Sequence, residues 1–348
     1  MNTVPDYDRS TTVRSLLKQT GIAKFIDTLG VTDVKVNRPG EIWTKSSAGW
    51  QRHSAPECSL DMARKLASTL VNFNRGKGAL TEQDPIKSVE LPAGQRGQAL
   101  IPPACEPNTV SFTVRIASKD RYSLDDLIGF GAFEGFRDVS PNKSVPADVE
   151  LEPFELEMMA AKEQRDIRRF FELAVLNGQN IVLVGGTGSG KTTLTKALAD
   201  LVPPETCVCT IEDTHELSLP NHPNRTHLFF SDALPARELV KSTLRMMFDR
   251  VYLSELRGDE AWDYLTLLNT GHQGGMTTVH ANDCISALAR IATLIKQSPV
   301  GLTLDWNYLL AEVKRTIDVV AFMDKKTKRM TQLYFDPVGK WKLQRGLA

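Results

Sequence analysis

Residues 181–193 read Ile-Val-Leu-Val-Gly-Gly-Thr-Gly-Ser-Gly-Lys-Thr-Thr. The apolar residues at the start of this stretch predict a short buried strand, and the apolar spacing from Leu194 onward predicts a helix. Between them, a glycine at 185 and the triplet Gly-Lys-Thr at 190–192 fit the pattern of a phosphate-binding loop. Glycines let backbone N–H groups converge on phosphate oxygens, and the positive end of the following helix points at the same anion. The stretch therefore predicts nucleotide binding.

The phosphate-binding pattern predicts a role for each polar residue of this loop. Lys191 is expected to reach the β- and γ-phosphates, and the hydroxyl of Thr192 is expected to hold Mg²⁺. The alternative is a glycine turn that only joins a strand to a helix. The flanking strand and helix favour nucleotide binding, so ATP and Mg²⁺ are the expected cofactors. The predicted nucleotide-binding residues are Gly185, Gly186, Thr187, Gly188, Ser189, Gly190, Lys191, Thr192 and Thr193.

Composition limits the class of protein. The chain has 348 residues and a formal net charge of zero, so it can hold two domains and creates no global field toward nucleic acid or membrane. It contains no run of about 18 apolar residues, and its first residues lack an apolar signal core. The odd number of cysteines is typical of reduced thiols. We therefore expect a cytoplasmic protein.

The pattern of the chain changes along its length. Residues 1–12 read as a flexible N-terminus, and residues 13–135 mix helical and strand patterns, which predicts a smaller α+β domain with an antiparallel sheet. Residues 136–153 contain several prolines and few periodic apolar positions, so we interpret them as a linker. In residues 154–348 apolar strands alternate with helices, which predicts an α/β domain with a parallel sheet covered on both faces.

Acidic side chains follow two of the predicted strands, where ligands of such sheets gather. Glu255 follows an apolar run and could polarise an attacking water as a catalytic residue. The alternative for Glu255 is a helix cap or a salt bridge with Arg257. Glu212 and Asp213 follow the preceding strand and could hold hydrated Mg²⁺ together with Thr192, or share the water. The alternative for this pair is a polar strand end that caps the next segment.

An imidazole follows a further strand of the same sheet. His280 comes directly after the apolar and threonine-rich run that ends at Val279. It could bond the γ-phosphate and report its hydrolysis, and the alternative is a structural histidine. Together these strand ends predict one catalytic edge with Glu255, Glu212 and His280.

Four segments resemble the motifs of a known family, in its order and spacing. Residues 185–193 resemble its nucleotide loop, and Thr-Ile-Glu-Asp-Thr-His-Glu at 210–216 resembles its aspartate box. Ser-Glu-Leu-Arg-Gly-Asp-Glu at 254–260 resembles its Walker B motif, and residues 271–282 resemble its histidine box. The chain thus resembles the secretion and pilus traffic ATPases, most closely the type IV secretion ATPases of conjugative DNA transfer and effector export. This resemblance implies a C-terminal RecA-like P-loop NTPase domain.

The resemblance also implies an assembly and a location. It implies a homohexameric ring at the cytoplasmic face of the inner membrane, in peripheral association with other secretion-system ATPases and inner-membrane components. The family brings an arginine of the N-terminal domain to the phosphates; the segment 111–116 resembles that region, which makes Arg115 a candidate catalytic residue. Its alternative is a solvated strand arginine. The family's Arg-Met-Arg-Pro-Asp-Arg appears here as Arg-Met-Met-Phe-Asp-Arg at 245–250, without the middle arginine and the proline.

Other functions stay open at this point. A nucleic-acid translocase or helicase would show aromatic stacking platforms among basic residues, and Trp341 in the basic tail is a weak example. A nucleotide-gated scaffold has no need of Glu255, and a small-molecule kinase needs an acceptor pocket that these motifs do not supply. A related type II secretion or pilus retraction motor remains a further alternative. We therefore predict an ATPase that powers type IV secretion, with direct nucleic-acid contact left open.

Overall fold

The computed structural model describes residues 8, 10–46, 48–74, 78–116, 121–231 and 233–347. The chain forms two compact units, Met1–Asp120 and Arg121–Ala348, which we call the N-terminal and C-terminal domains and describe separately. The first helix begins at Ser10, so the end of the expected flexible N-terminus is helical, while residues 1–7 and 9 lie outside the described residues. Within the described ranges, no helix is long and apolar enough to cross a bilayer.

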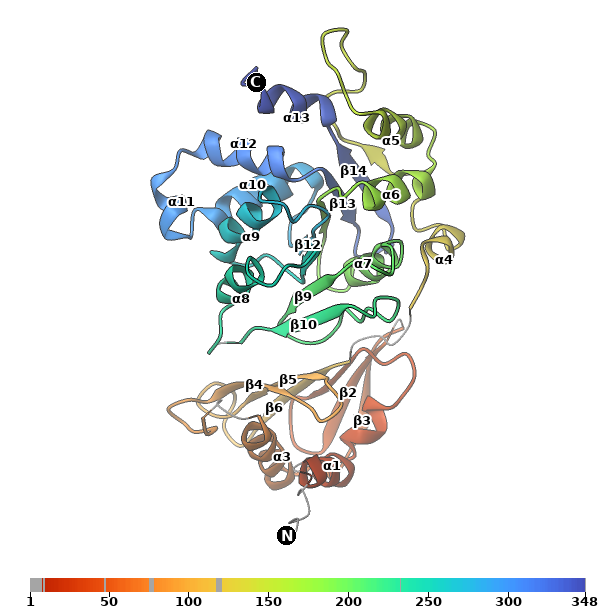
Figure 1. Ribbon diagram of the computed structural model, residues 1–348. Coiled ribbons are helices and arrows are strands. Elements are labelled where there is room, and N and C mark those ends of the chain that lie inside the picture. Colours follow the sequence, from red (N-terminus) through yellow and green to blue (C-terminus); the bar gives the residue numbers. More distant parts are fainter. Residues whose placement is uncertain are drawn as a thin grey trace, which may run out of the picture. The chain divides into compact units, whose positions relative to one another are not determined.

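The N-terminal domain is an antiparallel sheet packed against helices, as expected. Its strands are β1 (Asp33–Val36), β2 (Glu41–Ser46), β3 (Gly49–Ser54), β4 (Ile86–Glu90), β5 (Arg96–Leu100) and β6 (Ser111–Arg115), and its helices are α1 (Ser10–Gln19), α2 (Ile22–Ile26) and α3 (Leu60–Phe73). The strand order is β3-β2-β1-β6-β5-β4, and α1 and α3 lie on one side of this sheet (Figure 1). Burial alternates along β4, β5 and β6, because one face of the sheet packs on the apolar sides of α1 and α3.

The C-terminal domain is built on an eight-stranded sheet. Its strands are β7 (Arg137–Asp138), β8 (Ile181–Val184), β9 (Val208–Glu212), β10 (Arg225–Phe229), β11 (Arg250–Leu253), β12 (Met276–Val279), β13 (Val319–Met323) and β14 (Met330–Phe335). Its helices are α4 (Leu124–Gly129), α5 (Pro153–Glu163), α6 (Ile167–Leu176), α7 (Lys191–Ala199), α8 (Ala236–Thr243), α9 (Glu260–Asn269), α10 (Cys284–Ile295), α11 (Pro299–Thr303), α12 (Trp306–Thr316) and α13 (Pro337–Gln344). The sheet order is β10-β9-β11-β12-β8-β13-β14-β7.

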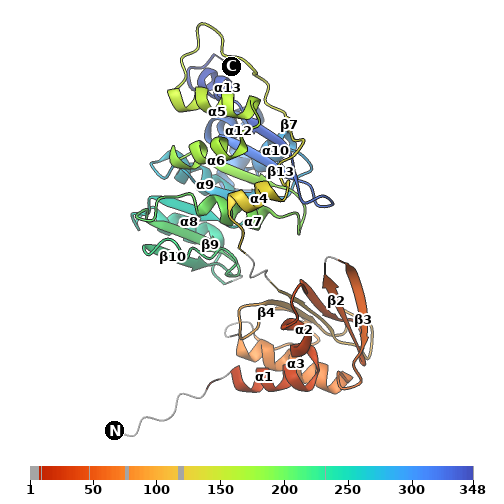
Figure 2. The ribbon, with the colours of Figure 1, turned by 90° about the vertical axis from the view of Figure 1, so that its right-hand side faces the viewer.

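The strands from β10 to β13 in the sheet order are parallel, and β14 pairs with β13 in the antiparallel direction. Strand β8 shows why both faces are covered. Ile181 and Leu183 belong to the core beneath α4–α7, whereas Val182 and Val184 belong to the core beneath α8, α9, α10 and α12 (Figures 1 and 2). Successive side chains of a strand point to opposite faces, so a strand buried on both sides is apolar throughout. The expected α/β fold with helices on both faces is confirmed.

The segment expected to be a linker, residues 136–153, lies inside the C-terminal domain, and the boundary falls earlier, between Asp120 and Arg121. Strand β7 pairs with β14, and the backbone N–H of Val139 donates to Leu333. The buried ammonium of Lys162 donates to Ser140 and to the carbonyl of Phe335 and lies 3.2 Å from Asp138. The prolines and charged residues of this segment are typical of a linker. In the structure its polar groups instead form hydrogen bonds and ion pairs at the edge of the sheet.

The apolar spacing of residues 155–176 predicts one long helix, but the structure has two helices there, α5 and α6. Arg165 adopts a left-handed φ of 65°, which a continuing helix does not allow. Asp166 then accepts a hydrogen bond from the backbone N–H of Arg169 and caps α6. The apolar spacing continues across the break at Arg165 because α5 and α6 both bury their apolar sides in the same core.

Candidate active site

The predicted phosphate loop connects β8 to α7. Gly185, Gly188 and Gly190 all have positive φ, of 143°, 76° and 100°. A Cβ on Gly185 would lie 2.3 Å from the carbonyl oxygen of Met323 in β13, so the position admits only glycine. The loop is therefore shaped by its own backbone and by close contact with the neighbouring strand.

Lys191 is held inside this loop. Its ammonium donates to the carbonyls of Gly185 at 2.7 Å and Gly186 at 3.0 Å, and the residue is 9% exposed. Burial lowers the pKa of Lys191, while the nearby carboxylates of Glu255 and Glu216 oppose that shift. The loop thus encloses one cation at the positive end of a helix, which is the electrostatic arrangement that binds phosphate.

The hydroxyls of the loop fit a phosphate ligand. Ser189 is buried, and its Oγ has no hydrogen-bond partner within the described part of the chain. A buried hydroxyl without a partner costs free energy unless a ligand completes it. Thr192 and Thr193 are half-buried in the first turn of α7, and Thr192 holds the position directly after Lys191 where the loop pattern places a hydroxyl for a magnesium ion. The residues present therefore fit a nucleotide with its metal.

His280 joins the loop to Glu255. The Nδ1 atom of the imidazole lies 3.0 Å from the carbonyl oxygen of Gly185, and Nε2 lies 3.2 Å from Oε1 of Glu255. Both neighbours are hydrogen-bond acceptors, so the imidazole lies between the loop and the carboxylate with one ring nitrogen toward each. Glu255 is 17% exposed and follows the buried strand β11 directly after Ser254. The structure therefore brings two of the expected catalytic residues together at the phosphate loop.

Arg257 extends this contact to the next strand end. One guanidinium nitrogen, Nη2, lies 2.9 Å from Oε2 of Glu255, and Nη1 lies 2.9 Å from Oδ2 of Asp213. A polar chain thus runs from Gly185 through His280, Glu255 and Arg257 to Asp213, across the carboxyl ends of β8, β12, β11 and β9. The salt bridge between Glu255 and Arg257, considered from sequence as an alternative to catalysis, is present beside the site and orients the carboxylate.

Glu212 lies at the carboxyl end of β9 and is held there by backbone hydrogen bonds. Its carboxylate is fully buried, and Oε1 accepts hydrogen bonds from the backbone N–H groups of Glu216 at 2.9 Å and Leu217 at 2.7 Å. Strands β12 and β11 lie between β8 and β9, which separates the two strand ends by about 14 Å. The hydrogen bonds of Oε1 go to the loop that follows its own strand, so a role of Glu212 toward a hydrated Mg²⁺ stays a prediction.

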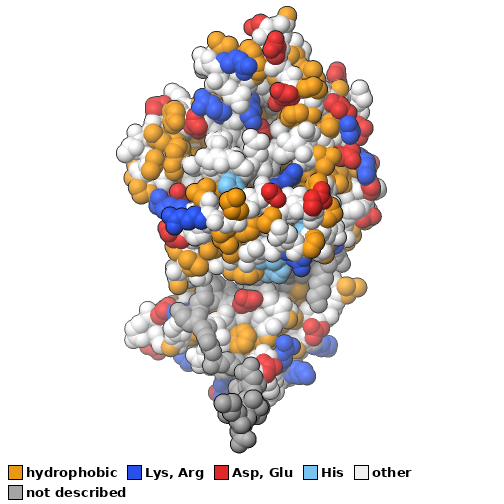
Figure 3. Space-filling view, viewed as in Figure 1, with side chains coloured by type: hydrophobic (Ala, Val, Ile, Leu, Met, Phe, Trp, Pro, Cys, Tyr) orange, Lys and Arg blue, Asp and Glu red, His pale blue; other side chains and the backbone are white. Residues whose placement is uncertain are grey.

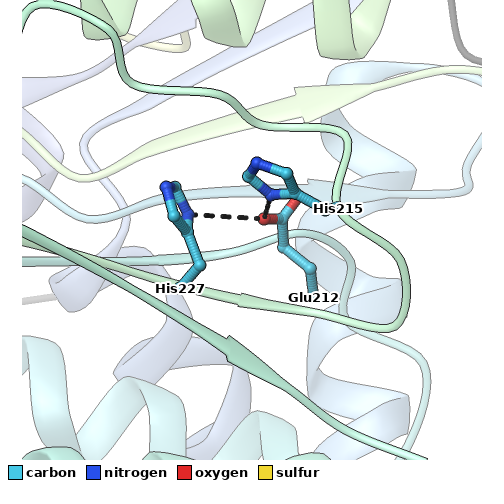
Figure 4. A group of neighbouring side chains, drawn as sticks. All are labelled: Glu212, His215 and His227. Carbon is cyan, nitrogen blue, oxygen red and sulfur yellow. Dashed lines mark hydrogen bonds and ion pairs between the residues drawn. The ribbon is translucent and has the colours of Figure 1, made fainter. Parts of the chain in front are cut away.

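The other oxygen of Glu212 faces two histidines. Oε2 lies 3.2 Å from Nδ1 of His215 and 3.8 Å from Nδ1 of His227 (Figure 4). Burial lowers the pKa of His227, His215 adds to this shift, and Glu212 opposes it. Sequence reasoning missed both histidines because β10, which carries His227, was not predicted as a strand.

Arg115 lies in the N-terminal domain, at the end of β6. Its Nε lies 3.0 Å from Oδ1 of Asp33 on the neighbouring strand β1, and its side chain is 48% exposed. About half of the Arg115 side chain stays exposed beside this ion pair. The structure thus shows Arg115 on the surface of a domain separate from the one that holds the phosphate loop.

Comparison with known proteins extends these observations. A family model described as "Type II/IV secretion system protein" matches residues 147–324. The chain is 35% identical over 326 residues to the type IV secretion system protein VirB11 of Brucella suis, and the alignment covers 90% of this chain and 88% of that protein. The matched region contains all four of the motifs described above.

Solved structures agree with this similarity. The chain resembles the crystal structure of the VirB11 ATPase from the Brucella suis type IV secretion system in complex with sulphate, with a TM-score of 0.55, 34% identity and coverage of 97% of this chain and 98% of that one. It also shares its fold with the pilus retraction motor PilT with bound ADP, with a TM-score of 0.56, 16% identity and coverage of 88% and 77%.

Proposed function

This chain belongs to the type II/IV secretion system protein family, and from that premise we propose that it is the ATPase that powers or switches a type IV secretion system. The observation that carries the proposal is the polar chain from Gly185 through His280 to Glu255, which sets a carboxylate beside a phosphate loop. The transport functions that we propose are pilus assembly and transfer of DNA or protein substrates, including conjugation.

Different residues of the site bind the phosphates and the magnesium ion. The loop amides and Lys191 bind the β- and γ-phosphates and neutralise the charge that develops on them, and the unpartnered hydroxyl of Ser189 completes this cradle. Thr192 is the residue that would hold Mg²⁺, which supplies further charge neutralisation when bound. The site thus recognises a nucleoside triphosphate mainly by its phosphates.

Glu255 is the group that we assign to the attacking water. A carboxylate beside the loop can accept the proton of that water, and Arg257 and His280 hold it from both sides. His280 also contacts the carbonyl of Gly185, so a change in the phosphates can move the imidazole. Asp213 contacts the other arm of Arg257, and the charge of Glu216 opposes the lowering of the pKa of Lys191 by burial, so both carboxylates contribute to the electrostatics of the site.

We further propose that the working unit is a homohexamer, in peripheral contact with inner-membrane components and other secretion ATPases on the cytoplasmic side. The proposal rests on the family and on Arg115, a half-exposed arginine that an adjoining domain can bring to a nucleotide. Movement of the N-terminal domain against the C-terminal domain would then couple hydrolysis to transport.

The helicase alternative has less support. The guanidinium of Arg345 lies 4.0 Å from the ring centroid of Trp341, so one face of the tail aromatic is covered by its own arginine and is not free to stack on a base. On the face shown in Figure 3, acidic and basic side chains are interspersed. A single-stranded nucleic acid that stimulates hydrolysis many-fold would reverse this preference.

The test is Mg²⁺-dependent ATP hydrolysis by the purified full chain. Lys191→Ala should abolish turnover while circular dichroism and the thermal midpoint stay near those of the wild type. Glu205→Gln, an exposed change away from the described contacts, is the matched control and should retain full activity. Mass photometry with and without nucleotide then tests the hexamer, and a wild-type chain that hydrolyses no ATP as a ring contradicts the assignment.

A further inference from the structure

Two histidines and one carboxylate converge at the edge of the sheet, away from the phosphate loop. Glu212 ends β9, His215 lies in the loop that follows, and His227 belongs to the edge strand β10 (Figure 4). One ligand atom from each of the three lies within 4.8 Å of the other two. We propose that Glu212, His215 and His227 form a binding site for a transition-metal ion of the Zn²⁺ class.

The spacing suits tetrahedral coordination. Two bonds of about 2.05 Å at a tetrahedral angle place their ligand atoms about 3.4 Å apart. Oε2 of Glu212 lies 3.2 Å from Nδ1 of His215 and 3.8 Å from Nδ1 of His227. The two imidazole rings are 4.4 Å apart between centroids and inclined by 61°, so they do not stack face to face. The ligand atoms of His215 and His227 lie within 4.8 Å of each other, so both imidazoles would turn toward the carboxylate to share one ion.

The donor set selects the kind of metal. Two imidazole nitrogens and one carboxylate oxygen suit Zn²⁺ and similar ions, whereas Mg²⁺ prefers an all-oxygen octahedron. The site is thus chemically distinct from the magnesium expected at Thr192. The side chain of His215 is 44% exposed, while those of His227 and Glu212 are 19% and 1% exposed. An ion can enter past His215, and a water can take the fourth position.

The surrounding structure orients the ligands. Residue 227 lies directly opposite Thr210 in the β9–β10 pairing, and Thr210 and Glu212 share one face of β9. The hydroxyl of Thr210 lies 2.7 Å from Nδ1 of His227 and 3.0 Å from Oε2 of Glu212. An ion bound at Nδ1 of His227 would replace its contact with Thr210, whose hydroxyl would then donate only to Glu212. Such outer hydrogen bonds are the usual means of fixing metal ligands.

A metal here would act on the loop after β9. Oε1 of Glu212 already holds the backbone of Glu216 and Leu217, and His215 lies within the same loop. That loop also carries Asp213, the last member of the polar chain that begins at Gly185. An ion that ties His215 to the edge strand through His227 would therefore stiffen the loop that supports the active site, without touching the nucleotide.

The test uses the full chain, freed of metal with EDTA and kept without nucleotide or Mg²⁺. Zn²⁺ is titrated against a chromogenic chelator, and Co²⁺ is used in parallel for its visible spectrum. We expect one Zn²⁺ per chain and the intense bands of tetrahedral Co²⁺. His215→Gln and His227→Gln should each weaken Zn²⁺ binding at least 10-fold. His53→Gln, a histidine of the N-terminal domain bonded to Thr44, is the matched control and should bind as the wild type does.

Equal Zn²⁺ affinity in the wild type and His215→Gln would overturn the proposal and leave a hydrogen-bonded cluster without a metal. Weak octahedral-type Co²⁺ bands would overturn it as well. Because His215 is largely at the surface, its replacement should keep the fold, and the circular dichroism spectrum checks this. Zn²⁺ should also raise the thermal midpoint of the wild type and of His53→Gln, and not that of His215→Gln.

Discussion

His280 and Glu255 form a direct contact, with Nε2 of the imidazole 3.2 Å from Oε1 of the carboxylate. The same imidazole lies 3.0 Å from the carbonyl of Gly185 through Nδ1. One side chain therefore touches both the loop that binds phosphate and the carboxylate that we assign to the attacking water. This relationship makes the state of the nucleotide and the position of Glu255 physically dependent on each other.

Glu255→Gln should lower the rate of ATP hydrolysis by about 10²–10⁴-fold, because an amide of the same shape cannot accept the proton of the water. Nucleotide binding should change little, since the phosphates are held by the loop and Lys191. Single-turnover hydrolysis and equilibrium binding of a fluorescent nucleotide separate the two effects. Hydrolysis that stays within a factor of two of the wild type would remove Glu255 from the mechanism.

Arg257→Lys should lower kcat by about 10-fold with little change in KM, because Arg257 acts through Glu255. A lysine ammonium cannot bond Glu255 and Asp213 together as the planar guanidinium does at 2.9 Å on each side. Steady-state kinetics of the variant measure this division. Combining the change with Glu255→Gln should cost less than the product of the two single effects, and a fully multiplicative loss would show that Arg257 acts elsewhere.

Gly185→Ala should abolish nucleotide binding and destabilise the domain by about 1–3 kcal/mol. The added Cβ would meet the carbonyl of Met323 at 2.3 Å, and the φ of 143° is strained for any side chain. Gly186→Ala is the matched control for stability, because the nearest atoms to its Cβ are 3.6 Å away in the side chain of Lys325. Urea unfolding compares the two, and equal midpoints would contradict the steric argument.

Asp138→Asn should lower the free energy of unfolding at neutral pH by about 1–3 kcal/mol, because it leaves the buried Lys162 without its counter-charge. Burial favours the protonated acid, but hydrogen bonds from Ser140 together with Lys143 and Lys162 hold the pKa of Asp138 below its ordinary value. A carboxylate with a lowered folded-state pKa stabilises the fold above its unfolded pKa and loses that contribution as the pH falls through the folded pKa.

The free energy of unfolding measured as a function of pH, at acidic pH, tests this interpretation of Asp138. Below about pH 4 the wild type should lose stability faster than Asp138→Asn, whose side chain has no proton to gain. Asp148→Asn, an exposed change in the same segment, is the control and should follow the wild-type curve. Parallel acid-unfolding curves for the wild type and Asp138→Asn would show that this carboxylate does not hold residues 136–153 to the sheet.

Local patterns predicted much of the C-terminal domain because its elements are short and separated by strong signals. Apolar periodicity predicts a helix over residues 260–268 and a strand over 275–279, close to the observed α9 and β12. The sequence Ser-Leu-Asp-Asp at 123–126 predicts a helix start, and Ser123 opens α4 with a capping box to Asp126. The same rules missed the break at Arg165 and the pairing of β7, since neither depends on the apolar period. The turn at Arg165 and the edge strand β7 both depend on contacts with residues far away in the sequence.

The phosphate loop was determined by the sequence itself, because its glycines, Lys191 and Thr192 are contiguous and act through their own backbone geometry. Only the tertiary structure decided which carboxylates lie close to this loop. Strand order places β12, with His280, next to β8, and β11, with Glu255, one strand further, whereas Glu212 lies on β9 and turns to two histidines. Sequence shows that a polar group ends a strand, but the order of strands in the sheet sets its distance from the phosphates, and that order arises from packing of the whole domain.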